Sequence, residues 1–186
     1  MTHPLNIPRA SLACLAVACS LFLAASAPSF AAGDSGGPVK TCPRGEVYDG
    51  KAGRCVKQSS GSLDDESRYA YGSWLARSGR YGEAIEVLSL VENKDDPRVL
   101  NYLGYANRQL GRFEVGLGYY RQALVADPGY SKAREYLGEA YLVLNRPGLA
   151  REQLGEIGAR CGTTCEEYGL LADAIEEYEA ALARRS

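Results

Sequence analysis

The residues whose side chains could best react or bind a metal are six cysteines and one histidine. They fall into two groups along the chain. His3 lies near the start, together with Cys14 and Cys19. The remaining cysteines follow much later and form two pairs: Cys42, Cys55, Cys161 and Cys165. Thiols can act as nucleophiles, redox centres or metal ligands, and histidine is a common general base and metal ligand. The roles that remain open depend on whether the first group stays in the protein.

The first 32 residues have the build of a secretory signal peptide. Arg9 is the only charged residue before Asp34, an apolar run continues to Ala27, and small residues follow it. A basic start, an apolar middle and a small-residue end are typical of export signals. We expect cleavage after Ala31 or Ala32, which predicts a periplasmic or secreted protein.

Lipid anchoring through Cys19 and permanent membrane insertion are the alternatives for this segment. The residues before Cys19 resemble a lipoprotein signal, but Ala16 stands where Leu is usual and the apolar run continues past Cys19. The run is also a little short for a membrane span, and no anchoring residues flank its far side. We therefore expect no lipid anchor and no stable membrane insertion after cleavage.

Cleavage of the signal would remove the only histidine. A Ser-His-Asp or Cys-His catalytic site and a histidine-based zinc site are then excluded. We predict that the mature chain is not an enzyme and holds no metal or cofactor. Four cysteines in an exported chain indicate two disulfides. Local pairing of Cys42 with Cys55 and of Cys161 with Cys165 is the simplest of the three connectivities.

Residues 42–56 form a compact unit in which Pro43, Gly45 and Gly53 favour turns. One short strand at Val47–Tyr48 and a return strand at 55–56 would be closed by the first disulfide. The segment resembles Cys-Pro-x-Gly-x-Val-Trp/Tyr-Asp segments near the start of exported bacterial proteins, and half-motifs of small carbohydrate-binding modules. We favour a structural hairpin that protects the N-terminus, with cell-wall or glycan binding through Tyr48 and docking of a partner as the alternatives. Residues 58–62 are predicted to be a flexible linker.

From residue 63 onward the pattern is helical, and it repeats three times. A small residue, a turn residue and a second small residue recur in each segment. The turn residue follows the first small residue by seven positions, and the second small residue follows by five more. The positions are Gly72, Gly79 and Ala84; Gly104, Gly111 and Gly116; and Gly138, Asn145 and Ala150. A constant spacing with a period of 32 and then 34 residues indicates stacked pairs of helices. We expect the small residues to let the two helices of each pair approach closely.

This pattern resembles the tetratricopeptide repeat, and Leu103–Gly104 followed by Gly111–Arg112–Phe113 is the clearest match. The resemblance implies an all-α, tetratricopeptide-like helix-turn-helix solenoid of three repeats at 63–158. A disulfide-bearing loop and a C-terminal capping helix would follow at 159–186. The small disulfide-bonded hairpin would precede it within a flexible segment at 33–62. We expect left-handed backbone at the three turn residues and a capping box at Thr164 and Glu167.

The Cys161–Cys165 pair would then join the last repeat to the capping helix. A redox pair is the alternative, since close cysteines near a helix start can form reactive thiolates. However, three residues separate the two cysteines, rather than the two of thioredoxin-like sites, and no strand-helix-strand pattern surrounds them. We favour a structural disulfide.

In tetratricopeptide proteins the first helix of each repeat lines a concave surface. The resemblance implies that Arg, Lys and Asn on this surface hold a peptide, with tyrosines as contact residues. The candidate partner-binding residues are Tyr69, Arg98, Asn101, Tyr105, Arg108, Lys132 and Tyr136. Four further positions are expected to be exposed beside them: Ser73, Arg77, Glu135 and Glu139.

The sequence therefore predicts an exported protein-protein interaction scaffold that binds a peptide or helix of a partner. A formal charge of -2 does not indicate nucleic-acid binding. Cell-wall or glycan association through the hairpin and thiol-disulfide chemistry at the second cysteine pair are the alternatives. Three repeats are close to the minimum for an independent stack, which leaves weak self-association and a cap supplied by a partner as open alternatives.

Overall fold

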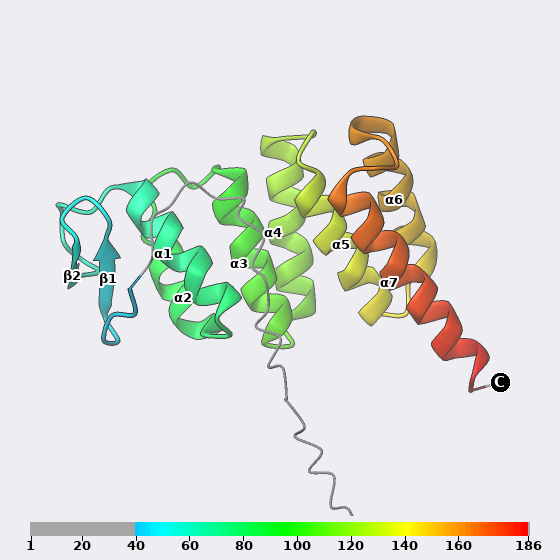
Figure 1. The fold of residues 1–186 in the computed structure, drawn as a ribbon, viewed down its shortest axis with the longest axis horizontal. Coiled ribbons are helices and arrows are strands. Elements are labelled where there is room, and N and C mark those ends of the chain that lie inside the picture. Colours follow the sequence, from blue (N-terminus) through cyan, green and yellow to red (C-terminus); the bar gives the residue numbers. More distant parts are fainter. Residues whose placement is uncertain (1–39, 186) are drawn as a thin grey trace, which may run out of the picture. The chain divides into compact units, whose positions relative to one another are not determined.

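The structure, a computed structural model, describes residues 40–185 of the chain. A two-stranded antiparallel hairpin precedes seven helices in this part of the chain (Figure 1). The strands are β1 (Glu46–Asp49) and β2 (Arg54–Lys57). The helices are α1 (Asp65–Arg77), α2 (Tyr81–Leu88), α3 (Pro97–Gln109), α4 (Phe113–Ala126), α5 (Ser131–Val143), α6 (Pro147–Cys161) and α7 (Glu166–Ala183). The predicted signal peptide lies outside the described residues.

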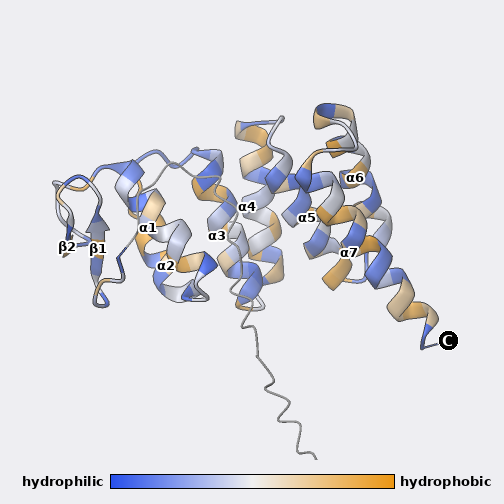
Figure 2. Cartoon of the chain, viewed as in Figure 1, coloured by the Kyte–Doolittle hydropathy of each residue, from blue (hydrophilic) through white to orange (hydrophobic). Residues whose placement is uncertain are grey.

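The first six helices pack as three successive pairs, and α7 packs against both helices of the last pair. Each helix carries both hydrophobic and hydrophilic residues (Figure 2), so the apolar sides can face one another between neighbouring helices. The predicted all-α solenoid of three repeats with a terminal helix is confirmed. No described helix has the length and hydrophobicity needed to cross a membrane.

The turns inside the three pairs have the same backbone geometry. Gly79, Gly111 and Asn145 all have positive φ, at 78°, 76° and 58°. The residue after each of them donates its amide to a carbonyl five positions earlier, as when Arg112 N–H donates to Asn107 O at 2.9 Å. This hydrogen bond is typical of a helix end with a left-handed residue. The expected left-handed turns are therefore confirmed.

Close helix contacts explain the first small residue of each repeat. A Cβ on Gly72 would lie 2.6 Å from Leu88 of α2, and a Cβ on Gly104 would lie 2.7 Å from Tyr120 of α4. Both glycines let the second helix of the repeat approach the first, as expected. A Cβ on Gly138 would instead lie 2.6 Å from Leu171 of α7. The expectation that Gly138 serves the contact with α6 is therefore wrong, because α7 fills this space.

The hairpin packs on the first repeat. Cys42 is joined to Cys55, and β1 pairs with β2 so that Val47 lies opposite Val56. The backbone N–H of Cys42 donates to the hydroxyl of Tyr71 on α1 at 2.9 Å, and Val47 is fully buried. Both belong to the same core cluster as the apolar residues of α1 and α2. The hairpin therefore covers part of the first repeat.

Two local sequence predictions fail at the helix starts. The predicted flexible linker at 58–62 contains hydrogen-bonded turns, and Leu63 directly after it is 4% exposed, because it joins the core under the hairpin. Helix α7 begins after Cys165, which is its N-cap residue without a side-chain cap bond. Thr164 therefore lies outside the capping position, and the predicted capping box does not form.

Candidate functional site

Four tyrosines from three different repeats contact one another in a row. They are Tyr69 of α1, Tyr102 and Tyr105 of α3, and Tyr136 of α5, and we call them the tyrosine row. Successive ring centroids are 6.1, 6.4 and 5.2 Å apart, within the range of favourable aromatic pairs. Tyr102 and Tyr105 are three positions apart on one helix and so lie on the same side of it. The first helices of all three repeats therefore present one continuous aromatic feature.

Two arginines contact the first half of the tyrosine row. The guanidinium carbon of Arg98 lies 4.3 Å from the ring centre of Tyr69. That of Arg77 lies 5.5 Å from the ring of Tyr102, whose hydroxyl accepts a hydrogen bond from Arg77 Nη1 at 2.6 Å. A cation over an aromatic face is attracted by the negative charge density of the ring. These contacts fix both arginines beside the rings.

Two cations lie beside the second half. The guanidinium carbon of Arg108 is 5.6 Å from the ring of Tyr105 and 5.7 Å from the ring of Tyr136. Its Nη2 donates to Glu139 at 2.6 Å, and its side chain is only 10% exposed. The Nζ of Lys132 is 5.8 Å from the Tyr136 ring. Burial raises the pKa of the Tyr105 and Tyr136 hydroxyls, so both tyrosines are neutral near pH 7.

The structure brings all seven predicted partner-binding residues to the first helices as expected, but it buries several of them. Tyr69 is 7% exposed and Asn101 is fully buried. Both polar atoms of the Asn101 side chain lack a hydrogen-bond partner among the described residues. Ser73 and Glu135 are also buried, so the expectation that these four positions are exposed is wrong. Repeat spacing assigns residues to a helix but does not specify how far their side chains are covered by the packing around them.

Arg98 is already engaged by carboxylates of this chain. Its Nη2 donates to Asp96 at 2.8 Å and to Glu66 at 3.0 Å. These hydrogen bonds, that to Asp96 first, raise the pKa of Arg98 and keep it charged. A partner carboxylate at this position would have to compete with two internal ones. Tyr105, Lys132 and Tyr136 remain partly exposed and are the better candidates for direct contact.

Glu135 is a buried acid at a position where the repeat pattern predicts exposure. It is 2% exposed on α5, and its Oε2 has no hydrogen-bond partner among the described residues. Burial, followed by the charge of Glu139, raises the pKa of Glu135 to about 8. Glu135 and Glu139 are four positions apart, which makes two acidic side chains neighbours on one helix. This spacing is the sequence signal for the repulsion between them. The carboxyl therefore changes charge close to neutral pH.

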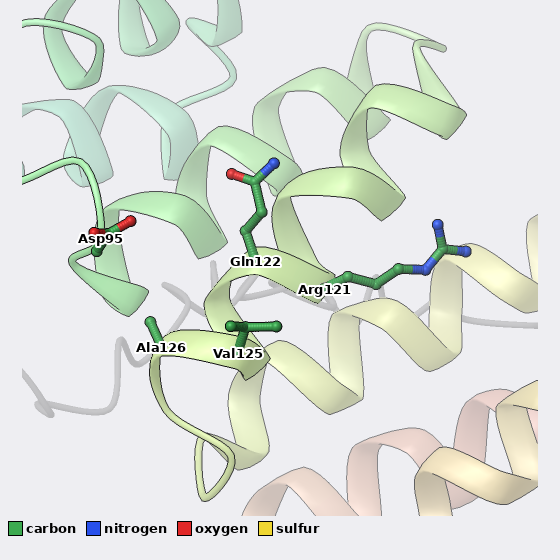
Figure 3. A pocket seen from close by; sticks show the side chains of 5 residues that line it. All are labelled: Asp95, Arg121, Gln122, Val125 and Ala126. Atoms are coloured by element: carbon green, nitrogen blue, oxygen red, sulfur yellow. The ribbon is translucent and has the colours of Figure 1, made fainter.

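Helix α4 carries a surface pocket that includes none of the partner-binding residues predicted from the sequence. It is lined by Asp95, before α3, and by residues from the second half of α4 (Figure 3): Arg121, Gln122, Val125 and Ala126. Val125 is 83% exposed there. The repeat pattern predicts binding residues on first helices only, so it gave no signal for this surface on a second helix. None of the seven candidate partner-binding residues lines it.

Comparisons with known proteins agree with the helical arrangement. A family model described as tetratricopeptide repeat matches residues 75–131 and 101–163. No curated protein matches the chain.

Solved structures share the fold at low sequence identity. The first TPR domain of Spaghetti (RPAP3) bound to the HSP90 peptide SRMEEVD is 19% identical, with a TM-score of 0.55 over 64% of this chain and 94% of that one. The TPR2B domain of yeast Sti1, in a complex with pHsp70, is 15% identical, with a TM-score of 0.54 over 66% and 98%. PcrH with the chaperone-binding region of PopD is 22% identical, with a TM-score of 0.53 over 67% and 98%. Residues 75–163 therefore match the tetratricopeptide repeat, and the described helices fold as a tetratricopeptide-like solenoid of three repeats and a terminal helix.

Proposed function

We propose that this protein is an exported protein-interaction scaffold that binds a peptide or helix of a partner along the tyrosine row. The observation that carries the proposal is the continuous contact of tyrosines across the first helices of three repeats. Tyrosine presents a large rigid surface together with one polar atom, and it is enriched where proteins bind one another. The role is binding, without a catalytic step.

The similar structures support this proposal. The RPAP3 domain holds an HSP90 peptide, the Sti1 domain is in a complex with pHsp70, and PcrH holds the chaperone-binding region of PopD. The fold thus presents a surface that can hold a peptide. The residues that would do so in this chain must be argued from its own side chains, because fold alone does not determine function.

The contact residues proposed here are Tyr105, Lys132 and Tyr136, with Arg98 at the edge. They are partly exposed, and they lie on α3 and α5. Asn101 would contribute to the packing of α3 rather than contact the partner directly, because its side chain is fully buried. Internal carboxylates already neutralise Arg98 and Arg108. We therefore propose that the partner's affinity comes mainly from apolar and aromatic contact with the rings.

Export remains part of the proposal. The apolar segment before residue 32 supports removal by a signal peptidase. Mass spectrometry of the protein from expressing cells should find an N-terminus directly after Ala31 or Ala32. A mature protein that retains Met1, or one that begins with a lipidated Cys19, would refute soluble export.

Co-purification from the cell envelope tests the binding surface. Tyr105→Ala with Tyr136→Ala should weaken recovery of the partner by about 2 kcal/mol in affinity, the usual loss at an aromatic hot spot. Gln122→Ala with Val125→Ala on the α4 pocket is the matched control and should retain the partner. Circular dichroism confirms that both variants are folded. Equal recovery with both double variants, or a loss confined to the α4 variant, would refute the proposed surface.

A further inference from the structure

The turn between α6 and α7 gathers two cysteines and a carboxylate. Cys161 is the last residue of α6, Cys165 is the N-cap residue of α7, and Glu167 lies in the first turn of α7. One potential ligand atom from each, namely two Sγ atoms and one carboxylate oxygen, lies within 4.8 Å of the others. The two sulfurs form a disulfide in the structure. The same three side chains are therefore close enough to share one cation when the sulfurs are free.

We propose that the reduced form of this turn binds a thiophilic divalent cation, such as Zn²⁺, through Cys161 Sγ, Cys165 Sγ and the Glu167 carboxylate. Zn²⁺ takes thiolate and carboxylate ligands in tetrahedral sites, and a water molecule can supply the fourth ligand. The sequence argued against a histidine-based metal site, because the predicted cleavage removes His3, the only histidine. The structure adds the third ligand, because the start of α7 places Glu167 beside both sulfurs.

The backbone of the turn holds the ligands on two helices. Gly162 has a φ of 84°, which reverses the chain directly after α6 and favours glycine. Its N–H donates to the carbonyl of Gly158 at 3.1 Å, so the turn continues from the last hydrogen bonds of α6. The Cα atoms of Cys161 and Cys165 are 5.9 Å apart. Opening the disulfide therefore requires side-chain rotation rather than movement of a helix.

Solvent can reach the ligand group. Cys161 is exposed, and Cys165 and Glu167 are half-buried. The free amides at the start of α7 carry partial positive charge, which attracts nearby anionic groups. Arg160, the neighbouring cation, forms an ion pair with Glu156 and donates its Nε to the carbonyl of Pro128. The guanidinium of Arg160 is thus held by Glu156 and Pro128, so it does not compete with a cation for the sulfurs.

Reduction and metal binding are linked. A dithiol reductant gives two electrons and two protons to the Cys161–Cys165 disulfide and becomes a disulfide itself. The two thiols then each release one proton as the cation binds. The oxidised turn lacks both thiolates, so only the reduced turn can hold the cation. Among the described residues, no comparable group of ligands includes Cys42 or Cys55.

Cobalt and zinc titrations of the reduced protein test the proposal. Cys14→Ser and Cys19→Ser remove the two thiols outside the described residues. The expected result is one Co²⁺ per chain with a thiolate-to-metal absorption band, and displacement of Co²⁺ by Zn²⁺. Glu167→Gln should weaken binding by at least about tenfold, the least loss expected when a metal site is perturbed. Glu166→Gln is the matched control, because Glu166 is adjacent but outside the ligand group.

Each outcome is decisive. The band should vanish in the Cys161→Ser, Cys165→Ser variant and in the oxidised protein, while circular dichroism shows that both remain helical. Absence of a band in the reduced protein would overturn the proposal. So would equal affinities for Glu167→Gln and Glu166→Gln, or a band that persists without Cys161 and Cys165 and so comes from the hairpin thiols.

Discussion

The two ends of the solenoid each carry a disulfide, but the two disulfides stand in different surroundings. At the N-terminal end, Cys42 is 3% exposed and lies in the core with Val47, and its N–H donates to Tyr71. At the C-terminal end, Cys161 is exposed. There the core contact comes from Leu171 of α7, which fills the space above Gly138. The disulfide-bonded hairpin, which is part of the core, thus closes the N-terminal end. Packing of helix α7 closes the C-terminal end.

This difference separates stability from chemical access. A disulfide inside a core constrains the chain and is shielded from reagents, whereas an exposed one can react with little change in packing. We infer that the hairpin bond serves the fold. The α6–α7 bond is the one available for further chemistry.

The largest expected effect comes from Leu171→Ala, which removes the buried contact of α7. Leu171 is fully buried, so its truncation should cost about 4 kcal/mol. Leu170→Ala is the control, because Leu170 is 44% exposed and should cost no more than about 0.5 kcal/mol. Urea unfolding measures both values. Similar losses for the two variants would mean that α7 does not close the C-terminal end as described.

Removal of each disulfide gives the next largest effect. The Cys42–Cys55 bond spans 13 residues, and its replacement by two alanines should cost about 3 kcal/mol. The Cys161–Cys165 bond spans 4 residues, and the same replacement should cost about 2 kcal/mol. Thermal unfolding of the two double variants checks the order. A greater loss at the C-terminal pair would reverse the proposed division of roles.

Glu135 should make stability depend on pH through the third repeat. Its pKa is raised to about 8 in the folded chain from 4.5, so the folded state binds the proton more tightly. This contribution is present at low pH and is lost as pH rises from about 5 to about 8, with a slope of about 1.4 kcal/mol per pH unit. Glu135→Gln should flatten that slope in denaturant unfolding. Glu152→Gln, an exposed control on α6, should retain the slope of the parent protein.

Gly138→Ala should have the smallest effect. Alanine gains about 1 kcal/mol of helix propensity, but its Cβ would lie 2.6 Å from Leu171, so the net result is a loss of about 1 kcal/mol. Gly118→Ala in α4 meets no atom within 4 Å and should stabilise by about 1 kcal/mol. Chemical unfolding distinguishes the two signs. A stabilising Gly138→Ala would show that α7 does not approach α5 so closely.

The parts of the fold that follow from local backbone rules were predictable. Gly79, Gly111 and Asn145 could be assigned to left-handed turns because few residues tolerate positive φ. The fit of α7 over Gly138 was not predictable, since it depends on which distant side chain fills the space. The hairpin could be recognised from its cysteines and glycines, whereas its packing through Tyr71 is a tertiary contact.

The candidate site was predictable in position and less so in exposure. Repeat spacing placed Tyr105 and Tyr136 on first helices, and the structure joins their rings. The same spacing placed Asn101 and Glu135 beside them, but neighbouring helices bury both. Periodicity identifies the side of a helix, whereas burial depends on how closely the next helix approaches. The α6–α7 ligand group needed both the turn geometry and the start of α7.

Hydrogen exchange of the protein with and without its co-purified partner tests binding along the tyrosine row. We expect slower exchange with the partner bound in peptides that cover residues 98–108 and 132–139, which carry the exposed part of the tyrosine row. Peptides covering residues 119–126 on α4 should exchange at the same rate in both states. Protection confined to residues 119–126, or to the hairpin at 42–57, would contradict binding along the tyrosine row.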